Sequence, residues 1–120
     1  MFPLTISRTG GVAGFRDVLV VTGDGLVTVA QKGRVPWSCH LSSSAATRLS
    51  LTASEVPWPR LTPASTGPSF PDDLVTTVQS PAGGPVRLED PLMGAHSAVF
   101  TELVNDLHGG RSASGMCRPL

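Results

Sequence analysis

The sequence predicts an α+β fold, in which a mostly antiparallel sheet of about five strands is covered on one face by two helices. Two observations favour this class. Alternating or β-branched apolar residues in 2–7, 15–21, 26–30, 74–79 and 86–89 indicate strands, whereas 43–54 and 99–107 repeat apolar residues at helical spacing. The expected element order is β-β-β-α-β-β-α. A chain of 120 residues has the size of one domain, so we expect residues 1–110 to form a single domain.

The first three expected strands lie within the first thirty residues. Leu4 and Ile6 alternate with polar residues in the first strand, and Phe15–Val21 is dense in the β-branched residues that strands favour. Asp24-Gly25 is a dipeptide that tolerates positive φ in tight turns. Phe15–Val21 and the alternating segment Leu26–Ala30 are therefore predicted to form a hairpin.

The middle of the chain predicts a short helix between less regular segments. Residues 35–41 are a further candidate strand, which Pro36 restricts to an edge or an irregular crossing. The hydroxyls of Ser42–Ser44 are suitable N-caps for a helix from about Ser43 to Ser54, which ends before the prolines that follow. Residues 56–72, rich in Pro, Ser and Thr, are expected to form a long crossing loop.

The last third of the chain predicts a second hairpin, a helix and a tail. Residues 74–79 and 86–89 are the expected strands, with Pro81–Gly84 as their connection. A final helix follows, ended by Gly109-Gly110. Its apolar stripe comprises Val99, Phe100, Leu103, Val104 and Leu107. Residues 111–120 carry no periodic apolar pattern, and we expect them to form a flexible C-terminal tail.

The charge and hydropathy of the chain exclude several function classes. Nine basic and nine acidic residues give a formal net charge of zero, so no global field attracts nucleic acid or an anionic membrane. No apolar run approaches the roughly 20 residues that span a bilayer. Met1–Ser7 lacks the charged start and long apolar stretch of a secretory signal. We therefore expect a cytoplasmic monomer that binds neither nucleic acid nor membranes.

No catalytic or metal-binding constellation stands out in the sequence. Zinc-peptidase, serine-hydrolase and phosphate-loop motifs are absent, and His40, His96 and His108 show no ligand spacing. We expect a protein that is not an enzyme and needs no cofactor or metal. Cys39 and Cys117 are too far apart for a CxxC motif, and two separate thiols are expected. A bridge between them would require the tail to fold back.

The segment from Arg8 to Phe15 contains more small residues than a turn requires. Three interpretations are open. Its N–H groups could cradle a phosphate, although phosphate loops normally lead into a helix and a strand is expected here. Its glycines could serve only to reach positive φ in a long hairpin connection. Alternatively, a bare, narrow loop could enter the cleft of another protein and offer its main chain for hydrogen bonds.

The pattern Arg8-x-Gly-Gly-Val-Ala-Gly14 after an initial strand resembles the emfourin family, as does the order of the elements that follow: Leu41-Ser42 opening a helix, a hairpin and a terminal helix. The resemblance spans Leu4 to Leu107, so residues 1–110 would form an emfourin-like domain. Emfourins look like small inhibitors of thermolysin-like zinc metallopeptidases. The resemblance thus implies a non-enzymatic inhibitor with such a peptidase as its partner. The partner-binding residues that it implies are Arg8, Gly10, Gly11, Val12, Ala13 and Gly14.

Two alternatives to the inhibitor stay open. One is a general protein-interaction domain with an unrelated partner, in which the glycine pattern is only a signature of the fold. The other is an enzyme whose site the sequence hides. An inhibitor predicts loss of peptidase activity on complex formation, an interaction domain predicts binding elsewhere, and an enzyme predicts turnover without any added peptidase.

Overall fold

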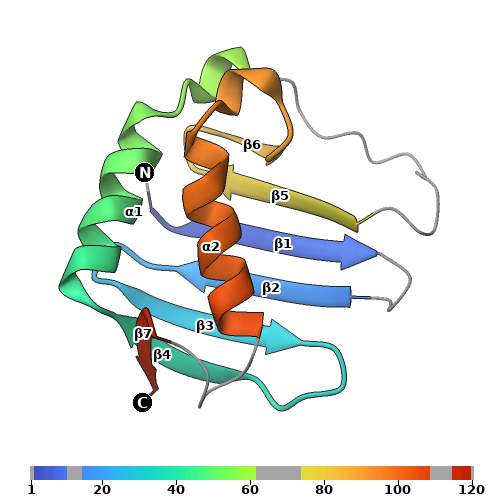
Figure 1. Ribbon diagram of the computed structural model, residues 1–120, viewed down its shortest axis with the longest axis vertical. Helices are drawn as coiled ribbons and strands as arrows, with labels where there is room; N and C mark the ends of the chain where they lie inside the picture. The colour runs from blue at the N-terminus through green and yellow to red at the C-terminus, as the bar shows by residue number, and fades with distance from the viewer. Residues whose placement is uncertain (1, 11–14, 62–73, 109–114, 120) are drawn as a thin grey trace.

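Two helices lie across one face of a seven-stranded antiparallel sheet (Figure 1). The computed structural model describes residues 2–10, 15–61, 74–108 and 115–119. The strand order is β6-β5-β1-β2-β3-β4-β7. The strands are β1 (Leu4–Gly10), β2 (Phe15–Val21), β3 (Leu26–Gln31), β4 (Trp37–Leu41), β5 (Leu74–Ser80), β6 (Gly83–Arg87) and β7 (Cys117–Pro119), and the helices are α1 (Ser43–Glu55) and α2 (His96–His108). The α+β class and the placement of both helices on one face are confirmed.

The sheet has seven strands, so the expected number of about five was too low. Strand β4 pairs with β3 on one side and with β7 on the other, which places it inside the sheet and not at its edge. Pro36 does not prevent this, because the strand begins one residue later, at Trp37. The proline therefore removes no donor from the ladder of hydrogen bonds.

The β5–β6 hairpin is tighter than expected. Its turn contains only Pro81 and Ala82, and Gly83 and Gly84 already belong to β6. Gly84 has a φ of +115°, and a Cβ atom at this position would lie 2.9 Å from the carbonyl oxygen of Val78. A side chain cannot be accommodated there, so the second glycine fits β6 closely against β5.

Helix α1 begins and ends close to the expected positions. The Ser42 hydroxyl accepts a hydrogen bond from the Ala45 N–H at 3.2 Å, which is the N-cap that the serine cluster predicts. After the helix, Trp58 lies buried in a short 3₁₀-helix, Trp58–Arg60, and its indole N–H donates to the Ala53 carbonyl at 2.9 Å. The start of the expected crossing loop is thus part of the core, and residues 62–73 lie outside the described part.

The main core lies between the sheet and the two helices. Helix α2 directs its predicted apolar stripe inward, since Phe100, Leu103, Val104 and Leu107 are all buried. They face buried strand residues that include Leu4, Ile6, Leu19, Val21, Val27 and Val29. Among the described residues, no helix is long and apolar enough to cross a membrane.

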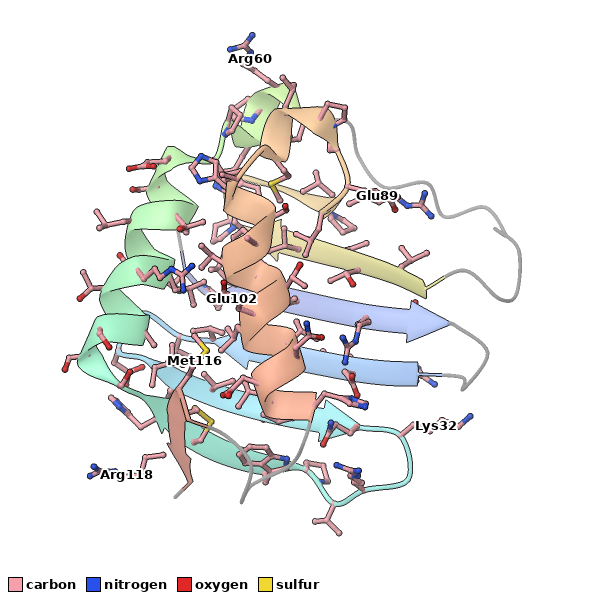
Figure 2. The ribbon with its side chains drawn as sticks, in the orientation of Figure 1. Lys32, Arg60, Glu89, Glu102, Met116 and Arg118 are labelled. Atoms are coloured by element: carbon pink, nitrogen blue, oxygen red, sulfur yellow. A yellow bond between two sulfur atoms is a disulfide. The ribbon has the colours of Figure 1, made fainter. Side chains whose placement is uncertain are left out.

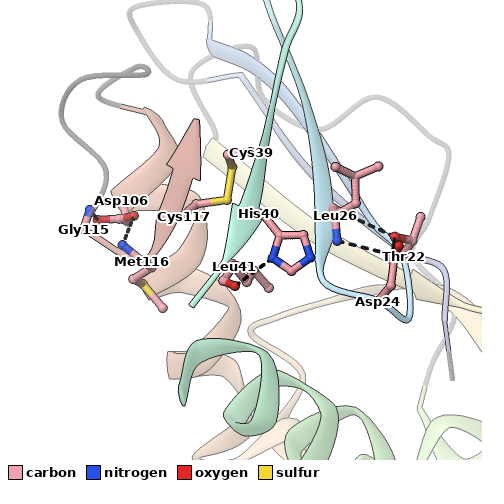
Figure 3. The surroundings of a disulfide bond; sticks show 10 residues. All are labelled: Thr22, Asp24, Leu26, Cys39, His40, Leu41, Asp106, Gly115, Met116 and Cys117. Atoms are coloured by element: carbon pink, nitrogen blue, oxygen red, sulfur yellow. Dashed lines mark hydrogen bonds between the residues drawn. A yellow bond between two sulfur atoms is a disulfide. The ribbon is translucent and has the colours of Figure 1, made fainter. Parts of the chain in front are cut away.

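The C-terminal segment differs most from the expected flexible tail. Residues 117–119 form β7, and Cys117 is joined to Cys39 of β4 by a disulfide with a Cα–Cα distance of 5.5 Å (Figure 3). The N–H groups of Gly115 and Met116 donate to the Asp106 carboxylate of α2, at 3.1 and 3.2 Å. The expectation of two separate thiols is therefore wrong. So is that of a free tail for these residues, because the segment folds back and pairs with the edge of β4, whereas residues 111–114 and 120 lie outside the described part.

Removal of this disulfide is expected to lower the free energy of unfolding by about 2 to 4 kcal/mol, because the bond closes a long loop and restricts the unfolded chain. The two cysteines are 78 residues apart in sequence, and both are buried. Thermal melting with and without a strong reductant measures the effect. The double variant Cys39→Ala/Cys117→Ala is the control, since reductant should not change its melting temperature. Equal melting of the oxidised parent and a parent shown by mass to be fully reduced would contradict the expectation.

Candidate functional site

A row of polar side chains crosses the core face of the sheet beneath the last turns of α2. Arg8 of β1 lies opposite Asp17 of β2, and Asp17 lies opposite Gln31 of β3. The Arg8 guanidinium donates to Asp17 Oδ2 at 3.2 Å, and Gln31 Nε2 donates to Asp17 Oδ1 at 3.4 Å. Arg8 is 8% exposed and Asp17 is 4% exposed. A charged pair buried to this degree must be held by mutual hydrogen bonds, as this one is.

Helix α2 closes the row from above with two residues three positions apart. Asn105 Oδ1 accepts from Arg8 NH1 at 2.6 Å, and His108 Nδ1 lies 2.7 Å from Asp17 Oδ2. Because a carboxylate only accepts, this geometry gives Nδ1 the proton. We call Arg8, Asp17, Gln31, Asn105 and His108 the Arg8 cluster. It ties the C-terminal end of α2 to the three central strands.

The end of α2 is also held by side chains at the β3–β4 connection. The carbonyl of His108, the last residue of the helix, accepts from Gln31 Nε2 and from Arg34 NH1, both at 3.3 Å. Carbonyls of the last helical turn lack partners within the helix, and cationic donors are favourable there because of the helix dipole. The Arg8 cluster and Arg34 therefore fix the helix, the sheet and the β3–β4 connection relative to one another.

The glycine segment continues directly from this cluster. Gly10, two residues after Arg8, ends β1 with a φ of +93°, and it pairs with Phe15 of β2 and Leu74 of β5. Only glycine adopts this backbone conformation readily. The connection from Gly10 to Phe15 thus departs from the middle of the sheet, beside the Arg8–Asp17 pair. Residues 11–14, which include the other expected contact residues Gly11, Val12, Ala13 and Gly14, lie outside the described part.

The structure gives Arg8 a different place from the one that the resemblance implies. We expected Arg8 to contact a partner, for example through a carboxylate. It is buried, however, and its guanidinium contacts Asp17 and Asn105 inside the molecule. Arg8 is therefore covered by α2 and is not exposed to a partner in this structure.

The Asp17–His108 pair has the geometry by which a buried carboxylate orients an imidazole in acyl-transfer enzymes. The same carboxylate oxygen also accepts from Arg8, and the cluster holds three strands and a helix together. This arrangement is typical of a structural network. The thiols of Cys39 and Cys117 are consumed in the disulfide, which removes both as nucleophiles.

The sequence interpretation missed Asp17, Gln31, Asn105 and His108 as neighbours of Arg8. One signal was present: Arg8 and Asp17 occupy inward positions in strands whose other inward residues are apolar, such as Ile6 and Leu19. Two opposite charges at matching inward positions of paired strands favour a buried pair. No such signal pointed to Asn105 and His108 of α2, because their contacts with Arg8 and Asp17 depend on where the helix lies over the sheet.

Comparison with known proteins identifies no relative of this chain. The chain matches no protein-family model, no curated protein and no solved structure. The emfourin resemblance therefore rests on the Arg8 to Gly14 pattern and on the order of the elements.

Proposed function

We propose that this protein is a non-enzymatic inhibitor of a thermolysin-like zinc metallopeptidase, that it acts as a monomer, and that it docks through the segment Gly10–Gly14. The main observation in favour of the proposal is that both strands flanking this segment are firmly held in the fold. Strands β1 and β2 pair over seven consecutive residue pairs up to Gly10 and Phe15. Both strands are interior to the sheet, and the Arg8 cluster fixes them to α2. The residues at both ends of the segment are thus ordered before a partner binds, and their order costs no further conformational entropy on binding.

The mode of inhibition follows from this arrangement. A narrow glycine-rich segment offers main-chain groups to a cleft without bulky side chains in the way. If β1 and β2 hold the segment in an orientation that does not suit cleavage, the segment occupies the cleft and the peptidase does not cut it. Arg8 contributes as a positioning residue, because it is buried and its guanidinium bonds to Asp17 of the neighbouring strand and to Asn105 of α2.

The disulfide bears on the compartment in which the protein acts. Buried disulfides persist in oxidising compartments and are rare in the cytosol. The cytoplasmic location that the sequence favours stays a prediction. The Cys39–Cys117 bond supports the opposite proposal, an oxidising compartment, and labelling of free thiols in protein taken directly from its host would decide between the two.

Ala13→Glu tests the docking segment. The substitution keeps all three glycines of the segment, so a simple hairpin connection is expected to tolerate it within about 0.5 kcal/mol of stability. A docking segment is expected to lose several kcal/mol of binding free energy, because the carboxylate would be desolvated without a partner or would clash. The measurement is the inhibition constant against a thermolysin-like peptidase, with circular dichroism to verify folding.

Ala82→Glu is the matched control for this experiment. Ala82 is exposed in the β5–β6 turn, which lies at the opposite end of the sheet because the last residues of β5 pair with the first residues of β1. It should inhibit as well as the parent. Equal potency of Ala13→Glu and the parent would contradict docking through this segment. Absence of inhibition by the parent against a panel of such peptidases would favour the alternative, a general protein-interaction domain.

A further inference from the structure

The β3–β4 turn, residues 32–36, reaches the same end of the sheet as the glycine segment. The backbone N–H of Lys32 donates to the Arg16 carbonyl at 3.0 Å, and Arg16 directly follows Phe15, where the chain re-enters the sheet after the glycine segment. Figure 1 shows the β3–β4 connection, the end of β1 and the start of β2 on the same side of the molecule. A partner that covers the glycine segment therefore lies close to this turn.

The turn presents one exposed apolar side chain, which follows two exposed cations in the sequence. Val35 is 85% exposed, the highest value among the large hydrophobic residues that the structure describes. Lys32 and Arg34 are exposed on either side of Gly33, and Arg16 is exposed on the neighbouring strand. The only carboxylate in 15–17 and 31–36 is the buried Asp17.

The chain as a whole has no net charge, and the described residues 15–17 and 31–36 carry three cations and one carboxylate. Asp72 and Asp73 lie outside the described residues. An exposed apolar side chain with cations on the same turn is complementary to an apolar depression beside carboxylates, and opposite charges across an interface accelerate association and fix its register.

The turn is held in place before any partner arrives. Arg34 N–H donates to the Gln31 carbonyl at 3.1 Å, and the Arg34 guanidinium donates to the His108 carbonyl. Gly33 has a φ of +76°, which the turn requires and glycine permits. Through Gln31 and His108 the turn belongs to the same rigid frame as the Arg8 cluster. The turn and the glycine segment thus have a common support.

We infer that residues 32–36 form a second contact element, in which Val35 enters an apolar depression on the peptidase and Lys32 faces carboxylates at its rim. This inference rests on the proposed function, because it names a further part of the same docking end. It extends the proposed contact beyond the glycine segment to a part of the chain that the emfourin resemblance does not assign. It also specifies the chemistry of the partner surface, which is acidic around an apolar centre.

The experiment compares inhibition of thermolysin-like peptidases by the parent, Val35→Asp and Lys32→Glu. Val35→Asp is expected to weaken inhibition by at least about tenfold, because an apolar contact is lost and a carboxylate faces the acidic rim. Lys32→Glu is expected to weaken it by about tenfold and to make it less sensitive to salt, because the attractive charge is reversed. Both residues are exposed, and Lys32→Gln provides a milder variant should the reversal disturb folding.

The matched controls are substitutions on parts of the surface that lie away from the turn 32–36. Leu51→Asp alters an apolar residue of α1 that is 58% exposed, and Arg60→Glu reverses a charge far from Lys32, as Figure 2 shows. Both controls should inhibit like the parent. Parent-like inhibition by the turn variants would overturn the second contact element alone. A parent that inhibits no peptidase of the panel would overturn both the proposed function and this inference.

Discussion

Arg8→Met is expected to lower the free energy of unfolding by about 3 to 5 kcal/mol, because it leaves the Asp17 carboxylate buried without its guanidinium partner. Arg8 and Asp17 are both more than nine-tenths buried and lie 3.2 Å apart. Methionine fills much of the volume of the arginine stem, so the loss reflects mainly the uncompensated charge. In thermal melting, the midpoint should fall by about 10 to 20 °C.

A double variant separates charge from packing. In Arg8→Met/Asp17→Leu both charges are replaced by apolar groups, and the stability should recover most of what the single variant loses. His108 then loses its contact with Asp17, but its side chain remains partly exposed to solvent. If Arg8→Met alone melts like the parent, the buried pair does not stabilise the fold, and the support that we assign to the glycine segment is absent.

Phe100→Ala is expected to cost about 3 to 5 kcal/mol, because it removes a large buried side chain and leaves a cavity that the neighbours fill only in part. Phe100 is fully buried on the face of α2 that covers the sheet. For a domain with about 5 kcal/mol of total stability, such a loss unfolds a large fraction of the molecules. Urea unfolding followed by circular dichroism measures the change.

Thr101→Ala is the control for this variant, because Thr101 is the next residue of the same helix and is exposed. It should change the stability by no more than about 0.5 kcal/mol. Equal unfolding midpoints for Phe100→Ala and Thr101→Ala would mean that α2 does not cover the sheet as described. A loss confined to Phe100→Ala supports the packing of this helix against the central strands.

The fold class and most elements were predictable from the sequence, because they depend on local patterns. Alternation identified β1 and β3, and the density of β-branched residues identified β2. The Ser42 cap marked the start of α1, and the stripe that includes Phe100 identified α2. Each of these signals lies within a few residues of the element that it predicts. The segment from Gly10 to Gly14 was likewise recognisable by composition alone.

The contacts between distant segments were decided only by the tertiary structure. The pairing of β7 with β4, the Cys39–Cys117 bond and the closure of the Arg8 cluster by α2 each join residues more than 70 positions apart. Local periodicity carries no information about such partners. A strand of three residues, such as β7, is stable only when it pairs with the edge of an existing sheet, here with β4. The sequence alone indicated the two helices and most of the strands, but not β7. The arrangement of these elements in space decided that Arg8 is buried and that residues 117–119 belong to the sheet.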